Sequence, residues 1–257
     1  MRTRLTTRVS FSPDSAAVDV TLPVGWTELS DSELLAVYRL MAVVPSEHLP
    51  VYVFSNLTGM KVLRHYDGVY VCRFRPGRGS RIVELSPETL AEHLAVLSFL
   101  SSPGAEPVRP SKIRGRKAVD ARLHGVTFGT YIRLENLYQG YIDSMSDAAM
   151  ETMCRLLYPG RRPCGEVPAE ERIAVLQWMV QLKEFFAIKF PHFFRPAPGS
   201  VDAPSMSDIM DSEIRALSGG DVTKEADVLE ADCWRALTEL DYKAKEAEEL
   251  RRLRNRK

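Results

Sequence analysis

The 257-residue sequence has no excess charge of either sign, because 34 Lys and Arg residues balance 34 Asp and Glu residues. A chain without net charge has no general attraction for a polyanion, so its composition does not predict a nucleic-acid-binding protein. Apolar residues make up 45% of the chain and charged residues 26%, the usual proportions of a globular protein. The sequence is long enough for one large domain or two smaller ones.

Long apolar runs are also missing. The basic residues near Met1 are not followed by an apolar stretch, so the N-terminus does not predict a secretory signal. The best candidate for a membrane helix, 173–194, contains Lys183, Glu184 and Lys189. We therefore expect a cytosolic protein without a membrane partner.

Cysteine pairs and catalytic motifs are absent. The four cysteines lie far apart and predict free thiols: Cys72, Cys154, Cys164 and Cys233. The glycine-containing loop 75–80 lacks the Gly-Lys-Ser/Thr ending of a phosphate-binding loop. The five histidines have no metal-binding spacing, and no nucleophile elbow occurs. We predict no catalytic residue, no cofactor and no metal site, and hence a protein that is not an enzyme.

The richest stretch in apolar and aromatic residues is 126–194, which we interpret as a hub of three packed helices. Thr127, Ser146 and Pro168 stand where each helix would begin. Apolar residues recur at spacings of three and four in all three segments. The third segment is apolar on most of its circumference, so protein must cover it on most sides. Trp178 and Phe186 are therefore predicted to be core residues.

Residues 1–108 predict a small α/β part. Residues 1–15 are polar and not expected to form regular structure, whereas 16–22 alternates like a strand. A capping box at Ser30–Glu33 opens a helix that must end near Pro45. Further elements are expected as follows: helix in preference to strand over 50–63, a hairpin turn at 66–68 between strands, a strand over 82–85 and a helix from Ser86.

Prolines and glycines divide the chain further. The stretch 101–110 marks a boundary, 112–122 could hold one short strand, and four breakers in 195–204 indicate a linker. Beyond it we expect a helix over 205–217 ended by Gly219–Gly220, and one long helix beginning at Thr223. The predicted fold is mainly α with a small α/β N-terminal part, divided into an α/β part (1–108), a helical hub (109–194), a linker (195–206) and a helical C-terminal extension (207–257).

The C-terminal extension is the part of the sequence that says most about possible partners. Residues 201–241 include eleven acidic and three basic residues, whereas 243–257 include seven basic and three acidic ones. This asymmetry on a tethered helix favours an oriented contact with another protein. The predicted partner-binding residues are Leu229, Cys233, Trp234, Leu237 and Leu240. The same seam equally fits a helix that packs back on its own hub.

Two basic clusters lie in the first half of the chain, around the hairpin at 73–81 and over 109–122. Aromatic residues are not interleaved with them, and no nucleic-acid-binding fold is recognisable. We do not expect nucleic acid as a partner. If contact occurs, the candidates are Arg114, Arg116 and Lys117.

Five segments of the hub and the extension carry a family resemblance: Arg133–Tyr141, Leu156–Gly160, Lys183–Phe194, Leu217–Lys224 and Trp234–Asp241. They resemble uncharacterised proteins encoded in the tail-gene region of bacterial prophages. The layout of helical body, linker and charged helical extension is similar to that of tail assembly chaperones of long-tailed phages, whose extension recruits the tape-measure protein. The resemblance implies a cytoplasmic morphogenesis protein in the host cell, with tail proteins or further copies of itself as partners. A neck or tail component of the virion, or a nucleic-acid-binding accessory protein, is the alternative.

Overall fold

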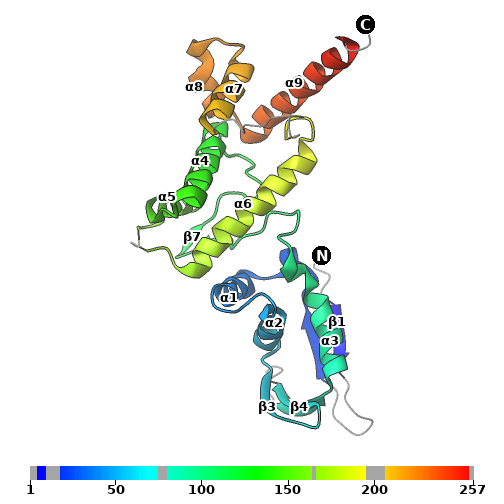
Figure 1. Cartoon of the computed structure of the whole chain (residues 1–257). Coiled ribbons are helices and arrows are strands. Elements are labelled where there is room, and N and C mark those ends of the chain that lie inside the picture. Colours follow the sequence, from blue (N-terminus) through cyan, green and yellow to red (C-terminus); the bar gives the residue numbers. More distant parts are fainter. Residues whose placement is uncertain (1–4, 10–17, 75–79, 164–165, 195–205, 255–257) are drawn as a thin grey trace. The chain divides into compact units, whose positions relative to one another are not determined.

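The structure is a computed structural model that describes residues 5–9, 18–74, 80–163, 166–194 and 206–254. The chain is mainly helical with a small α/β part near its N-terminus, as predicted (Figure 1). It forms two compact units. Unit 1 comprises 1–110 and 169–174, and unit 2 comprises 111–168 and 175–257.

Unit 1 contains two antiparallel sheets. Strands β1 (Leu5–Val9) and β2 (Val18–Leu22) pair with each other, and β3 (Lys61–Tyr66), β4 (Val69–Phe74) and β5 (Arg81–Leu85) form a second sheet in that order. Asp67 and Gly68 both have positive φ, as a two-residue hairpin turn requires. The expectation of no regular structure over 1–15 is wrong for β1, because pairing with β2 stabilises a strand that its own polar sequence does not indicate.

The helices of unit 1 begin largely where the sequence places its caps. They are η1 (Trp26–Glu28), α1 (Asp31–Met41), α2 (Leu49–Thr58), α3 (Pro87–Ala95) and η2 (Val96–Ser101). Ser30 and Glu33 form the predicted capping box of α1, and Ser86 caps α3. The ambiguous segment 50–63 is helical as far as Thr58, and left-handed Gly59 then redirects the chain into β3. Tyr38, Phe54, Phe74 and Leu97 are among the fully buried side chains of this unit.

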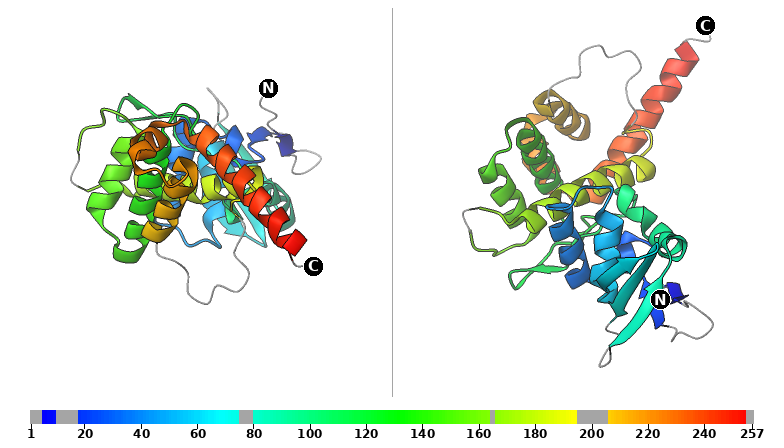
Figure 2. Two further views of the ribbon diagram at one scale, coloured as in Figure 1. Left: turned by 90° about the horizontal axis from the view of Figure 1, so that it is seen from above. Right: turned by 60° about the horizontal axis from the view of Figure 1, so that its bottom comes forward.

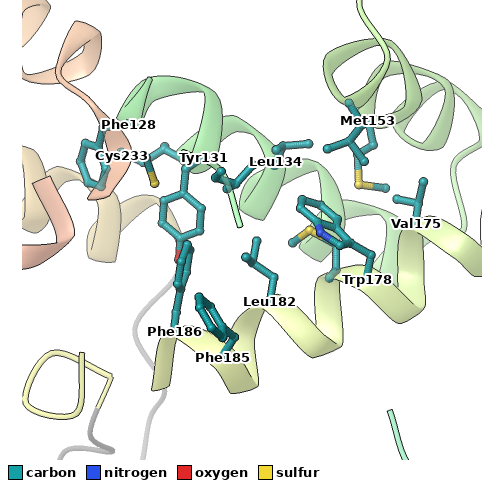
Figure 3. Packing of buried hydrophobic residues seen from close by; sticks show 14 of the residues in the cluster. Phe128, Tyr131, Leu134, Met153, Val175, Trp178, Leu182, Phe185, Phe186 and Cys233 are labelled. Carbon is teal, nitrogen blue, oxygen red and sulfur yellow. The ribbon is translucent and has the colours of Figure 1, made fainter. Parts of the chain in front are cut away.

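The helical hub consists of α4 (Phe128–Ser144), α5 (Asp147–Leu157) and α6 (Ala169–Lys189). Thr127 and Ser146 cap α4 and α5 as predicted. Figure 3 shows Leu134 of α4, Met153 of α5 and Trp178 of α6 directed toward one core. Trp178 and Phe186 are fully buried, and the Trp178 indole Nε1 donates to the carbonyl of Ala121 over 2.8 Å. The three-helix hub is thus confirmed, although Ala169–Ala174 of α6 group with unit 1.

A short hairpin precedes the hub. Residues 112–122 were expected to hold one strand, but the structure has two, β6 (Lys112–Ile113) and β7 (Arg116–Lys117). Arg114 and Gly115 both have positive φ and form the turn between them.

The C-terminal extension consists of α7 (Met206–Ser218), η3 (Val222–Lys224), α8 (Glu225–Glu230) and α9 (Cys233–Arg254). Gly219 and Gly220 end α7 as predicted. The prediction of one long helix from Thr223 is wrong, because Ala231 is extended and separates α8 from α9. The predicted linker 195–206 lies outside the described residues except for Met206, which begins α7.

Candidate partner-binding surface

The structure brings the five predicted partner-binding residues together, but it places most of their apolar surface inside unit 2. Cys233 and Leu237 are fully buried and Leu240 is nearly so, whereas Leu229 and Trp234 are half-buried. All five pack on the hydrophobic core that includes α4 and α6. A partner could contact the buried residues only by displacing parts of the same chain. The seam thus packs on its own hub, which is one of the two possibilities that its spacing equally allowed.

Trp234 shows how closely α9 is fitted to the hub. Its indole Nε1 donates to the carbonyl of Arg122 over 2.7 Å, and its ring stacks on His124 with centroids 4.5 Å apart. Its edge contacts are with the rings of Phe185, Phe186 and Phe190. Both the polar and the apolar parts of the indole therefore have partners within the chain.

Backbone pairing holds the start of α9 against the start of α4. The amide of Phe128 donates to the carbonyl of Ala231 over 2.8 Å, and the amide of Cys233 donates to the carbonyl of Val126 over 2.9 Å. Between them, the carboxylate of Asp232 accepts from the amides of Gly125 and Arg235. This bridge explains the break between α8 and α9, because residues that pair like a strand cannot continue a helix.

The surface left open by this packing is a groove formed by α7, α8 and α9, with a volume of about 550 Å³. Half-buried and buried apolar side chains line it: Leu217, Val228, Ala231 and Ala236. Exposed charged side chains of both signs also line it: Lys224, Asp227, Arg235 and Glu239. A groove of this volume, with apolar walls and a few charged groups, is of the kind that binds a ligand or an inserted side chain. We call it the α7–α9 groove.

The sequence pattern indicates the extension but not the groove. Most lining residues are ordinary small or charged helix residues, and only the break after α8 brings α7, α8 and α9 around a common hollow. In Figure 1, α7 and α8 lie beside the N-terminal end of α4, in agreement with their contacts. The C-terminal half of α9 extends away from the rest of unit 2 in both Figure 1 and Figure 2, and Leu250 and Leu253 on it are exposed.

A pair of carboxylates lies where α7 packs on α4. Glu135 is buried, and one of its oxygens accepts from the Lys183 ammonium over 3.1 Å, whereas the other has no hydrogen-bond partner among the described residues. Burial, reinforced by the charge of Glu135, raises the pKa of Glu213 on α7 to about 7. The contact between α4 and α7 therefore contains a carboxyl group that titrates near neutral pH.

The described cysteines are buried. Cys72 and Cys233 are free thiols, as predicted, Cys154 is also buried, and Cys164 lies outside the described residues. Burial raises the pKa of the Cys233 thiol to about 12 and that of Cys72 to about 11. Neither thiol is a ready nucleophile at neutral pH.

The three predicted nucleic-acid candidates lie together on the β6–β7 hairpin: Arg114, Arg116 and Lys117 are all exposed.

In the described ranges, no group of His, Cys, Asp and Glu side chains is arranged to hold a metal ion. No helix there has both the length and the apolar character needed to cross a membrane. Comparisons with family models, with curated proteins and with solved structures give no match for the chain.

Proposed function

We propose that the chain is a non-enzymatic morphogenesis protein of a phage tail, acting as a tail assembly chaperone in the host cytoplasm. Its partner would be another tail protein of the tape-measure type. The observation that carries the proposal is the α7–α9 groove, an open site with apolar walls. It lies in the C-terminal extension, the segment that recruits the tape-measure protein in the tail chaperones that the chain resembles. The segments of the hub and extension that resemble prophage proteins support a role in phage tail assembly.

The chemistry of the α7–α9 groove fits an amphipathic helix from a partner. Its apolar wall residues, such as Leu217 and Val228, can receive one or two apolar side chains, and this burial supplies the binding energy. Arg235 and Glu239 offer opposite charges one helical turn apart on α9, which can fix the direction of the bound helix. Binding in the groove leaves the core around Cys233 and Leu237 undisturbed.

Filling the groove tests the proposal. Thr238 is an exposed groove residue on α9, so Thr238→Trp should occupy the groove without disturbing the core. Co-expression with the tape-measure protein of the same prophage, followed by affinity capture, should show binding by the parent chain. We expect Thr238→Trp to weaken capture by about 2 kcal/mol or more, the usual loss at an interface hot spot.

Ala187→Trp is the matched control, because Ala187 is exposed on α6 and does not line the groove. It should bind like the parent. Equal capture by all three proteins would remove the groove from the proposal, and failure of the parent chain to bind any tail protein would reject the chaperone function. Mass spectrometry of purified phage particles then separates a chaperone, which is absent from them, from a neck or tail component.

A further inference from the structure

The β6–β7 hairpin concentrates positive charge in an arrangement that does not favour its own folding. Lys112 lies directly across from Lys117 in the strand register, and Ile113 lies across from Arg116. Like charges that face each other across an antiparallel pair are destabilising. The turn contributes a further cation, Arg114.

Little in the surrounding structure offsets this charge. Lys112, Arg116 and Lys117 are exposed and form no ion pair with any residue that the structure describes. The carboxylate of Asp120, the acidic residue that follows the hairpin most closely in the sequence, already accepts from its own turn and lies 2.9 Å from His124 Nδ1.

One neighbouring loop adds to the positive charge. The guanidinium of Arg116 lies over Gly160, within 3.6 Å of the position that a Cβ atom there would take. Arg162, which is exposed, follows Gly160 by two residues and is therefore within about 7 Å of it along the chain. Hairpin and loop together present cations from two separate segments of unit 2.

A purely structural role accounts for only part of this arrangement. Ile113 is 4% exposed and fixes the hairpin to the core. Arg116 lies near the C-terminal end of α5, where a cation favours the helix dipole. Lys112 and Lys117 have neither function, and a hairpin with a single lysine at this pair would fold at least as well.

The neutral net charge and the lack of interleaved aromatic residues do not predict nucleic acid as a partner, but the paired lysines of the hairpin do. We propose that the β6–β7 hairpin, together with Arg162, binds the phosphate backbone of a nucleic acid duplex. A row of solvated cations attracts phosphates through counterion release and needs no apolar contact. A protein partner would need an apolar centre to desolvate, and the only apolar side chain of the hairpin, Ile113, is buried. This activity is separate from partner binding in the α7–α9 groove and does not depend on it.

Fluorescence anisotropy with a labelled duplex and the full chain tests the proposal. If the four cations Lys112, Arg116, Lys117 and Arg162 contact phosphates, affinity should fall about 150-fold between 50 and 200 mM salt. The double variant Lys112→Glu/Lys117→Glu should bind more weakly and reduce the salt slope by about 2. The control Lys245→Glu/Arg251→Glu makes the same change in net charge on exposed positions of α9 and should bind like the parent.

A single substitution separates binding from folding. Lys112→Glu places opposite charges across the hairpin, so its melting temperature should equal or exceed that of the parent while its affinity for the duplex falls. The proposal is overturned if the parent does not bind the duplex at 50 mM salt, or if the hairpin and control variants lose affinity equally. Competition by polyglutamate as effective as that by unlabelled duplex would also overturn it, in favour of an acidic protein.

Discussion

Two glycines on α4 differ in the space around them. A Cβ atom on Gly129 would lie 3.1 Å from the carbonyl oxygen and 3.2 Å from the Cβ atom of Leu229, whereas one on Gly140 would have nothing within 4 Å. The first two values describe a close approach of α8 to α4, in which an added Cβ atom would require Leu229 to move by a few tenths of an ångström. Gly140 has no such reason to be glycine.

We therefore expect opposite effects from the same substitution on one helix. Gly129→Ala should lower the free energy of unfolding by about 1 to 3 kcal/mol, because the backbone of Leu229 must move. Gly140→Ala should raise it by about 0.5 to 1 kcal/mol, because alanine loses less entropy in a helix. Urea denaturation measures both. If Gly129→Ala also stabilises the protein, α8 does not pack on α4 as described.

For single residues, the sequence predicts those structural roles that depend on neighbours in the chain. Ser30, Thr127 and Ser146 cap their helices as expected, because an N-cap bonds to amides two or three residues away. The special role of Gly129 depends on Leu229, 100 residues further along, and no local pattern indicates it.

At the scale of elements, the contact between α4 and α7 should depend on pH. In the unfolded chain Glu213 titrates near its ordinary pKa of 4.5, and in the folded chain near 7. Between these values the native state holds a proton that the unfolded state has released, so stability falls as pH rises through this window. The loss is roughly 3 kcal/mol at most.

Glu213→Gln removes the titration while keeping the side-chain shape. Its thermal unfolding curve should change less between pH 5 and pH 8 than that of the parent, and its melting temperature at pH 8 should be higher. Glu184→Gln, an exposed position on α6, serves as the control and should retain the parent's pH dependence. An unchanged pH dependence in Glu213→Gln would show that this carboxyl is not buried against Glu135.

Element prediction succeeded where apolar spacing and breakers agree, as in α4, α5 and α7. It was wrong for β1 and for the long helix expected from Thr223. Both exceptions are decided by backbone pairing that the segment's own pattern does not show. β1 pairs with the neighbouring strand β2, and Asp232 pairs with Thr127 across more than 100 residues.

On the scale of the whole molecule, the extension is part of unit 2 and not a separable recruiting domain. Cys233, Leu237 and Leu240 are buried in the same core as Trp178 and Phe186. The sequence left open whether the α9 seam would bind a partner or its own hub, because an apolar seam has the same spacing in either case. Only the arrangement of the helices distinguishes the two and reveals the α7–α9 groove.

The linker predicted at 195–206 suggests that the extension can be removed without harm to the hub, but a chain ending at Phe194 should lose stability because α9 packs in the core of unit 2. It would expose the core surface that α9 covers, including the rings of Phe185 and Phe190 against Trp234. We expect it to aggregate or to melt at a lower temperature than the full chain, as measured by light scattering and circular dichroism. A matched chain ending at Lys245 keeps the buried part of α9 and should melt like the parent. Equal melting temperatures for the chain ending at Phe194 and the parent would restore the extension as an independent part.

The backbone bridge between Val126–Phe128 and Ala231–Cys233 also bears on how the protein is made. A ribosome adds about 5 to 20 residues per second, so the residues that complete this bridge follow those that begin it by roughly 5 to 20 s. During that interval the apolar side of the hub has no α9 to cover it. Unit 2 can close only after Leu240 has been translated, so the nascent chain exposes this apolar surface until synthesis is nearly complete.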